Sequence, residues 1–274
     1  MQRRTFLNTT LAAGGLAALP VGISSAADDS KAKPMRQIFE LRTYQLRDGK
    51  KDLFDAYASK ALLPALNRAG VKSVGVFHEQ LVPPAADAKP SDVKPVPAAF
   101  VLIPHNDASQ LGTVTAALSS DSAYQQAAAE YLSVPATDPV FDRIESSVFL
   151  AFETIPKLEA PTNKPTLYNL RVYESHNEAA GKKKIEMFNK GEIDIFRRVG
   201  LTPVFFGEAI VGTRLPNLTY LLAFKDDAAR QLAWNTFRAD PEWIKLKAIP
   251  EYEDKKIVSK ITNKLLTPAE YSQI

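Results

Sequence analysis

Two arginine–tyrosine pairs are the residues of this sequence whose types and spacing are best suited to chemistry. Arg42 and Tyr44 are two residues apart, as are Arg171 and Tyr173, and both pairs lie in runs where polar and apolar residues alternate. Side chains two residues apart on a strand share one face of a sheet. The other face of each run is apolar. We therefore expect the apolar faces to meet helices and the arginine–tyrosine faces to line the interior of the fold.

Two interpretations of these pairs are open, because a buried guanidinium needs a partner. In the structural interpretation, the arginine forms an internal ion pair with Glu40 or with another carboxylate of the sheet. In the functional interpretation, Arg42 and Arg171 orient an anionic or carbonyl-bearing ligand inside a cavity. Tyr44 and Tyr173 would then supply hydrogen bonds to that ligand.

Glu192 is the candidate proton acceptor. It follows Phe188 by four residues and precedes Phe196 by four, so it falls on the apolar stripe of a predicted helix. The position that matches it in the first repeat, described below, is Leu62. A carboxylate at such a place is either held structurally by an arginine or a backbone amide, or it is a base whose pKa is raised beside a pocket.

The three histidines, His78, His105 and His176, have no mutual spacing that suggests a chelate, whereas a metal normally takes three or four ligands. The chain has no cysteine, which excludes disulfides and thiolate metal sites. We therefore predict no metal site. His78 ends a predicted strand and is the one histidine that we assign to ligand binding, with haem coordination or proton transfer as its possible roles.

Two further groups of residues are expected to be structural. The basic run Lys182–Lys184 lies early in a predicted helix, where the simplest interpretation is a solvated face. Trp234, Phe237 and Trp243 are expected to fill the core between two helices. No Rossmann, Walker or nucleophile-elbow fingerprint is present in the sequence.

The elements that must position these residues occur twice along the chain. Residues 39–80 align with residues 168–210, and both copies contain a Leu-Arg-x-Tyr motif. In each half a strand with an arginine–tyrosine pair is followed by a helix that ends at a glycine, two strands, a second helical region and a last strand. The order β-α-β-β-α-β is that of a ferredoxin-like unit.

This repeat divides the chain into two domains. The first covers residues 36–156 and carries a proline-rich insertion at 81–98, the linker covers 157–166, and the second domain covers 167–274. A ferredoxin-like unit leaves one face of its sheet bare, and two copies can cover each other's bare faces. The predicted fold class is α+β, with two tandem ferredoxin-like domains that form an intrachain pseudo-dimeric α/β barrel.

Residues 1–27 are predicted to be a twin-arginine signal peptide. Arg3 and Arg4 precede an apolar stretch at 11–23, and small residues follow at Ser25–Ala27. The apolar stretch is shorter than the roughly 20 residues that span a membrane. We predict a periplasmic or secreted protein that has no stable membrane insertion once the signal is cleaved.

Charge limits the choice of partners. The formal net charge is +3, and loss of Arg3 and Arg4 lowers it to about +1. Such a balance gives no electrostatic basis for nucleic-acid binding. A small-molecule ligand and a homo-oligomer both remain open, and no motif identifies a cofactor.

Several stretches resemble the NIPSNAP family. The resemblance is carried by Phe39–Leu46, Leu170–Tyr173, Glu186–Phe196, Gly200–Gly207, Pro216–Tyr220 and Asp240–Trp243. It covers nearly all of residues 36–274 as two tandem domains, strongly in the second and in degenerate form in the first. It implies the dimeric α/β-barrel superfamily, which also holds cofactor-free monooxygenases and haem-binding proteins. No catalytic residues come with this resemblance, because the NIPSNAP branch has no settled reaction.

The leading hypothesis is an exported NIPSNAP-type barrel that binds a small molecule in the interior of its pseudo-dimer. It could be a cofactor-independent oxygenase-like or isomerase-like enzyme, with Glu192 and Tyr173 as catalytic residues and Arg42, Tyr44, Arg171 and His78 as ligand-binding residues. The alternatives are a non-catalytic interaction module of the periplasm and a haem-binding protein. These residues leave open whether the chain is an enzyme.

Overall fold

The computed structural model describes residues 35–81 and 97–274, in which the order β-α-β-β-α-β occurs twice. The strands are β1 (Ile38–Leu46), β2 (Gly75–Glu79), β3 (Ala98–His105), β4 (Phe141–Ala151), β5 (Leu167–Glu174), β6 (Thr202–Val211), β7 (Asn217–Phe224) and β8 (Lys260–Pro268). The described residues form one compact unit. The predicted signal peptide and most of the predicted proline-rich insertion lie outside the described residues.

The helices of the two halves correspond closely. The first half has α1 (Lys51–Tyr57), a π-helical segment η1 (Ala58–Leu62), α2 (Leu63–Arg68), α3 (Ser109–Ser120), α4 (Ser122–Ala127) and α5 (Ala129–Leu132). The second half has α6 (Glu178–Met187), a π-helical segment η2 (Phe188–Glu192), α7 (Ile193–Arg198), α8 (Asp227–Ala239), α9 (Pro241–Lys247), the 3-10 turn η3 (Pro250–Tyr252) and α10 (Asp254–Ile257). Within the described parts of the chain, no helix combines the length and apolar character needed to cross a membrane.

The eight strands close into one antiparallel barrel in the order β1-β3-β2-β8-β5-β7-β6-β4. Each half contributes four neighbouring strands, β4-β1-β3-β2 and β8-β5-β7-β6, and the two sets join where β2 pairs with β8 and β4 pairs with β6. Closure leaves no unpaired sheet edge. The fold is therefore a mixed α/β fold around a closed eight-stranded barrel.

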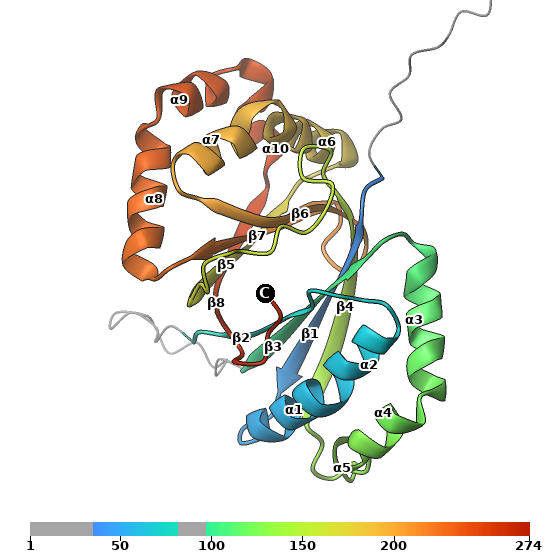
Figure 1. Cartoon of the computed structure of the whole chain (residues 1–274). Coiled ribbons are helices and arrows are strands. Elements are labelled where there is room, and N and C mark those ends of the chain that lie inside the picture. Colours follow the sequence, from blue (N-terminus) through green and yellow to red (C-terminus); the bar gives the residue numbers. More distant parts are fainter. Residues whose placement is uncertain (1–34, 82–96) are drawn as a thin grey trace, which may run out of the picture. The chain divides into compact units, whose positions relative to one another are not determined.

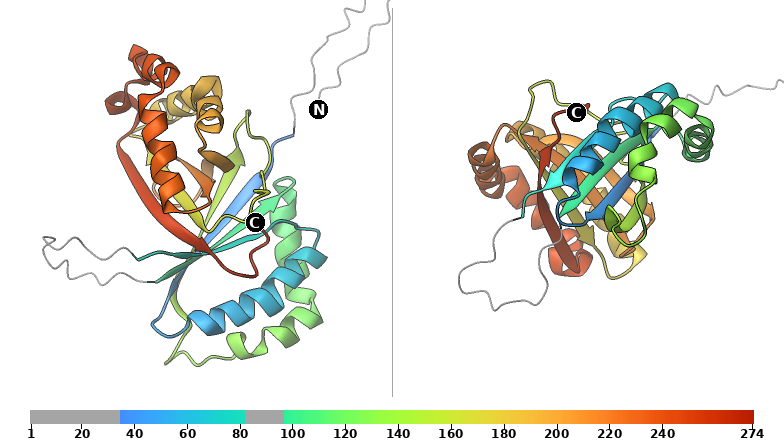
Figure 2. Two further views of the ribbon diagram at one scale, coloured as in Figure 1. Left: turned by 60° about the vertical axis from the view of Figure 1, so that its left-hand side comes forward. Right: turned by 90° about the horizontal axis from the view of Figure 1, so that it is seen from below.

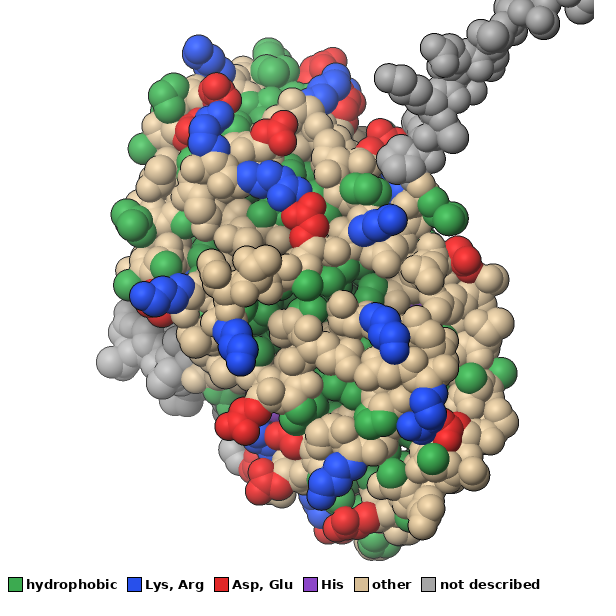
Figure 3. All heavy atoms as spheres, in the orientation of Figure 1, with side chains coloured by type: hydrophobic (Ala, Val, Ile, Leu, Met, Phe, Trp, Pro, Cys, Tyr) green, Lys and Arg blue, Asp and Glu red, His purple; other side chains and the backbone are tan. Residues whose placement is uncertain are grey.

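The helices lie outside the barrel in two groups. Helices α1–α5 cover one side of it and α6–α10 cover the other, as all the ribbon views show (Figures 1 and 2). One apolar core forms between each helix group and its strands, and a third core fills part of the barrel interior. On the face shown in Figure 3, basic and acidic side chains are interspersed.

The two faces of the strands are the reverse of what we expected from the sequence. Leu41 and Leu170 belong to the core inside the barrel, whereas Tyr44 and Tyr173 belong to the cores beneath the helices. Strand alternation defines two faces but does not say which one meets the helices. In this barrel both faces are covered, so apolar residues are required inside as well as outside.

Helix termini account for where the elements begin and end. Gly70 and Gly200 follow the first helical region of each half with φ of 85° and 88°, as expected for C-terminal glycines. Asp240 caps α9 through bonds from Glu242 N and Trp243 N, with Pro241 in the first turn. Helix α6 is capped by the Asn177 side chain.

Candidate functional site

A cleft opens between the sheet and the helices of the second half, with a volume of about 490 Å³. Strand β5 supplies Arg171 and Tyr173 to its floor, and helices α8, α9 and α10 supply Trp234, Trp243 and Asp254 to its walls. Trp234, Phe237 and Trp243 are buried in the core under these helices, as predicted, and all three also line the cleft.

Arg171 has only neutral hydrogen-bond partners. Its Nη2 donates to Tyr173 Oη at 3.0 Å, and its Nη1 donates to Asn263 Oδ1 at 3.3 Å. The guanidinium lies 4.6 Å from the centre of the Trp234 ring, a cation–π distance. Arg171 Nε and Trp234 Nε1 are both buried without a hydrogen-bond partner among the described residues. Burial opposes the charge of Arg171, but Tyr220 and Tyr173 raise its pKa, so the guanidinium stays charged.

Tyr173 is the centre of a small hydrogen-bond network. Its hydroxyl oxygen accepts from Arg171 and also from the Tyr220 hydroxyl, at 3.2 Å. A phenol oxygen that accepts two hydrogen bonds keeps its own proton available as a donor. Because Tyr173 lines the cleft, that proton is available to a molecule bound there. Burial raises the pKa of Tyr220 well above its usual value, so Tyr220 remains a neutral donor.

Behind Tyr173 lies a buried ion pair. Lys184 Nζ is 3.0 Å from Glu192 Oε2, and both side chains are almost fully buried. The ammonium also lies 4.8 Å from the Phe188 ring centre and 5.6 Å from that of Tyr173. Burial raises the pKa of Glu192 and is only partly offset by Lys184; burial lowers the pKa of Lys184, but Glu192 more than offsets it. The prediction of a solvated face for Lys182–Lys184 is wrong for Lys184.

Glu192 does not reach the cleft itself. Its oxygen bonds to Lys184, and the acidic side chain that lines the cleft is Asp254, whose Oδ1 is 3.7 Å from Lys184 Nζ. The structure thus brings Arg171, Tyr173 and Glu192 into one region, with Lys184 between the glutamate and the tyrosine.

The corresponding pair of the first half is neutralised internally. Arg42 donates to Glu40 through Nε at 2.7 Å and through Nη2 at 3.1 Å. Ser146 also donates to Glu40, and His105 Nε2 lies 3.5 Å from it. Burial raises the pKa of Glu40, but His105, Arg42 and Ser146 together lower it to about 2. The structural interpretation, an ion pair with Glu40, is therefore confirmed for Arg42.

Tyr44 and His78 also lie under the helices of the first half. The Tyr44 ring packs against Phe54 at 4.9 Å and belongs to the first helix–sheet core. His78 Nε2 is 2.8 Å from Asp55 Oδ1, which also accepts from Tyr271. Burial raises the pKa of Asp55, but His78, Lys51 and Tyr271 lower it to about 2. Neither residue joins the cleft around Arg171.

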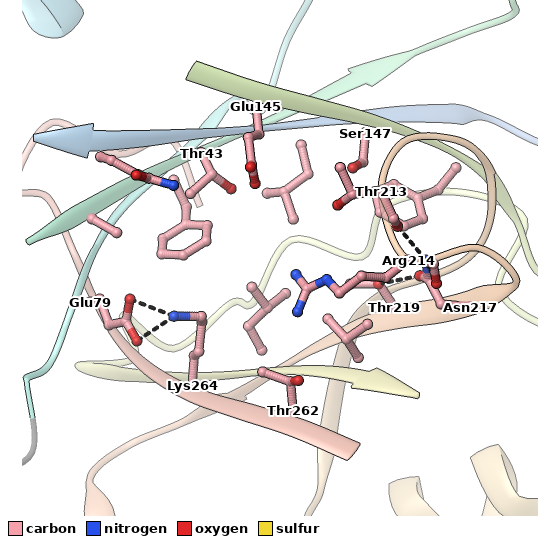
Figure 4. A pocket seen from close by; sticks show the side chains of 17 residues that line it. Thr43, Glu79, Glu145, Ser147, Thr213, Arg214, Asn217, Thr219, Thr262 and Lys264 are labelled. Atoms are coloured by element: carbon pink, nitrogen blue, oxygen red, sulfur yellow. Dashed lines mark hydrogen bonds and ion pairs between the residues drawn. The ribbon is translucent and has the colours of Figure 1, made fainter. Parts of the chain in front are cut away.

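A separate chamber occupies one end of the barrel interior, with a volume of about 410 Å³ (Figure 4). None of the six predicted site residues lines it. Its polar side chains include Thr43, Glu145, Arg214, Thr262 and the ion pair of Glu79 with Lys264. No group of three or more potential metal ligands occurs in residues 35–81 and 97–274.

Sequence reasoning missed one residue that lines the cleft, Asp254, and two that lie behind it, Lys184 and Tyr220. Lys184 precedes Glu192 by eight residues, close to two helical turns, so the two side chains could have been placed on one helix face. Tyr220 pairs with Arg171 across β5 and β7. Asp254 comes from the last short helix, and no local pattern connects it to β5.

The second half of the chain matches a known protein family. Residues 168–273 match the NIPSNAP family. This NIPSNAP match contains the Arg171 cleft and covers less than half of the chain. No curated protein matches the sequence.

Solved structures support the fold. A provisionally assigned monooxygenase from Fusobacterium nucleatum has a TM-score of 0.56 and 10% identity, covering 86% of this chain and 93% of that one. A second provisional monooxygenase, from Lactobacillus acidophilus, has a TM-score of 0.53 and 11% identity, covering 85% and 94%. An uncharacterised NIPSNAP-like protein from Burkholderia xenovorans covers 39% of this chain and 88% of its own, with 20% identity and a TM-score of 0.35. At these identities the first two show a shared barrel fold.

Proposed function

We propose that the cleft of the second half binds a small molecule through an anionic or carbonyl oxygen held by Arg171. The observation that carries this proposal is the state of the guanidinium, which is charged, bonded only to neutral groups and left with an unpaired Nε. Arg171 is partly buried, and a charge in such a place without a hydrogen-bonded counter-charge is costly, so a ligand oxygen would lower that cost. Trp234 adds a flat apolar wall and a second unpaired donor, which favours a planar ligand.

The chemistry that suits these groups is proton abstraction beside a carbonyl. When such a carbon loses a proton, the electron pair of the broken C–H bond moves towards the carbonyl oxygen, which becomes an enolate. Arg171 and the Tyr173 hydroxyl are placed to stabilise that oxygen. Asp254 lines the same cleft and would take the proton, while Glu192 keeps the Lys184 ammonium next to Tyr173. Isomerase-like and cofactor-independent oxygenase-like reactions both begin with this step.

We also propose that the two halves are tandem ferredoxin-like, NIPSNAP-type domains forming a pseudo-dimer, with boundaries at 36–156 and 167–274. The repeated element order, the matching strand orders and the π-helical segments η1 and η2 support a duplication. If this is right, the second half expressed alone should dimerise to close its own barrel. A monomeric second half by light scattering would contradict it.

Export is the remaining part of the proposal. The arginine pair at Arg3 and Arg4 before a short apolar stretch supports twin-arginine transport to the periplasm. Replacing both arginines by lysine should leave the full-length precursor inside the cell. Recovery of the processed protein from the periplasm of that variant would contradict the assignment.

The binding proposal is tested by purifying the chain from the periplasm and identifying co-purified small molecules by mass spectrometry, after an absorption spectrum has checked for haem. Loss of charged hydrogen bonds in R171M should weaken retention of the molecule roughly 10- to 100-fold. Y173F, which loses a single neutral donor, should weaken it by roughly threefold to tenfold. R47M is the matched control, because Arg47 is an exposed arginine of the first half paired with Asp142.

Unchanged retention in both R171M and Y173F would remove the cleft as the site. A haem spectrum that survives R171M and disappears in H78A would favour the haem-binding alternative. Absence of any co-purified molecule, together with no change in melting temperature across a set of aromatic acids and β-diketones, would favour an interaction module.

A further inference from the structure

The chamber inside the barrel is distinct from the cleft. Aromatic side chains pack against one another in the rest of the interior. The ring centres of Phe39 and Phe205 are 5.1 Å apart, and those of Phe77 and Tyr168 are 4.7 Å apart. At the other end more of the interior residues are polar, and a hollow of about 410 Å³ remains. That volume lies within the range of roughly 300–1,000 Å³ that is typical of small-molecule sites.

Two of the four charged groups in the chamber, Glu145 and the half-exposed Arg214, have no hydrogen-bonded counter-charge among the described residues. Lys264 Nζ donates to both oxygens of Glu79, at 2.6 and 2.7 Å, so this pair is satisfied. Glu145 makes no hydrogen bond or ion pair with the described residues. The Arg214 guanidinium is 3.9 Å from Glu174 Oε1, too far for a hydrogen bond, and that oxygen is itself unsatisfied.

The loop between β6 and β7 is built to bring Arg214 into the chamber. Gly212 has φ of 144°, and a Cβ there would lie 2.5 Å from Ser147 Oγ, so only glycine lets the loop lie against β4. Ser147 shares the interior face of β4 with Glu145. Arg214 has a φ of 59°, which is uncommon for a residue with a side chain.

The backbone of this loop is fixed by a side chain of the chamber itself. Asn217 Nδ2 donates to the carbonyl oxygens of Thr213 and Arg214, each at 3.2 Å. Thr219 in turn donates to Asn217 Oδ1. Figure 4 shows the Arg214 side chain extending from this loop into the hollow, and Glu145 pointing into the same hollow from the opposite wall. A strained, hydrogen-bonded backbone that directs a charge inward is typical of a ligand site.

We infer that the chamber binds a small zwitterion, with its carboxylate on Arg214 and its ammonium on Glu145. A simple anion on Arg214 would leave Glu145 without a partner, and a simple cation on Glu145 would leave Arg214 with only Glu174, which is 3.9 Å away and not hydrogen-bonded to it. A zwitterion satisfies both groups at once. The hydroxyls of Thr43, Ser147 and Thr262 also line the chamber, and Phe100 and Leu170 give an apolar surface for a side chain. Free α-amino acids are the class that has these features.

The test is isothermal titration of the purified chain with each of the standard free amino acids. At least one is expected to bind, and its C-terminal amide and its N-acetyl derivative should each bind roughly tenfold more weakly or worse, because each has lost one charge. E145Q and R214M should weaken the parent amino acid by a similar factor. In E145Q, the N-acetyl derivative should bind only slightly more weakly than the free amino acid, because the carboxylate that recognises the ammonium is already gone.

Two controls keep the result interpretable. E130Q removes an exposed glutamate of α5 and should bind the amino acid like the wild type. R214K keeps the charge but loses the two-pronged donor, so it should give an intermediate affinity. Melting curves of all the variants confirm that they are folded.

The inference would be overturned if no free amino acid bound the wild type, or if E145Q and R214M bound the parent compound unchanged. It does not depend on the cleft. Retention of the cleft molecule, measured on the same E145Q sample, is expected to be unchanged, so a failure at one site is distinguishable from a failure at the other.

Discussion

The two halves of the barrel place the same arginine–tyrosine pair beneath their helices, but the hydrogen-bond partners of the arginine differ between them. In the first half Arg42 is matched by Glu40, two residues before it on β1. In the second half the equivalent of Glu40 is Asn169, which donates to Asn263 and to a backbone carbonyl and leaves Arg171 without a carboxylate. A single residue type on the arginine's own strand therefore separates an arginine in an ion pair from an arginine without a hydrogen-bonded carboxylate.

The helices above the pairs differ in a complementary way. Eight residues before the end of each π-helical segment lies Phe54 in the first half and Lys184 in the second, and both contact the strand tyrosine. The segments themselves end at Leu62 and at Glu192. The first half shows that this position accepts a purely apolar pair. The Lys184–Glu192 pair is thus not required by the fold, which favours a role at the cleft.

The largest effect is expected from breaking the buried ion pair on one side only. E192L removes the hydrogen-bonded carboxylate of the buried Lys184 ammonium and leaves only Asp254, 3.7 Å away, which should cost about 3 kcal/mol in the free energy of unfolding. K184F/E192L copies the first half and should recover most of that loss. Urea unfolding of the wild type, the single variant and the double variant measures both values.

Binding of the cleft molecule by the same variants shows whether the Lys184–Glu192 pair acts at the cleft. If Lys184 and Glu192 act at the cleft, the refolded K184F/E192L protein should bind the cleft molecule more weakly than the wild type. Full retention by a stable double variant would make the ion pair a structural alternative to Phe54 and Leu62. A double variant as unstable as E192L would show that the two halves are not interchangeable here.

The next effect is a dependence of folding stability on pH that arises from Glu40 in the first half. The pKa of Glu40 is about 2 in the folded chain against an ordinary 4.5, so its carboxylate stabilises the fold above pH 4.5. That contribution, about 3 kcal/mol, is lost progressively as pH falls from 4.5 towards 2. E40Q should lose it at neutral pH and show a flatter stability profile in this window. Parallel profiles for wild type and E40Q in acid unfolding would show that Glu40 is not the group responsible.

Much of the fold was accessible from the sequence because its signals are local. Alternation in β1 and β5, the glycines at Gly70 and Gly200 and the capping Asp240 all act within a few residues, and the structure confirms these elements. The order of elements then implied a barrel, because each sheet needs its bare face covered.

The site was less accessible because it depends on contacts between distant segments. Which strand face meets the helices is set by the whole barrel, and the sequence interpretation of that point was wrong. The partners of Arg171 come from β7, β8 and α8. The chamber depends on Arg214, whose neighbours in sequence carry no pattern that directs it inward. The Glu40–Arg42 ion pair could be predicted from the sequence because its two residues are two apart on one strand.

The smallest effect is the most direct test of the comparison, since it converts the second pair into the first. Asn263 faces Arg171 across β8 as Ser146 faces Arg42 across β4. N169E/N263S therefore places a glutamate and a serine around Arg171 as Glu40 and Ser146 surround Arg42. The new carboxylate should form an ion pair with the Arg171 guanidinium and weaken retention of the cleft molecule roughly tenfold. Mass spectrometry of the co-purified molecule measures this loss.

The single variant N263S separates charge from shape. It removes the amide that bonds to both Asn169 and Arg171 but adds no carboxylate, so its effect on retention should be small beside that of the double variant. If N263S alone lost the molecule, the amide rather than the free guanidinium would be the recognition element. If the double variant kept it, Arg171 would bind its ligand even beside a carboxylate, and the difference between Glu40 and Asn169 would not explain why Arg171, and not Arg42, lines a cleft.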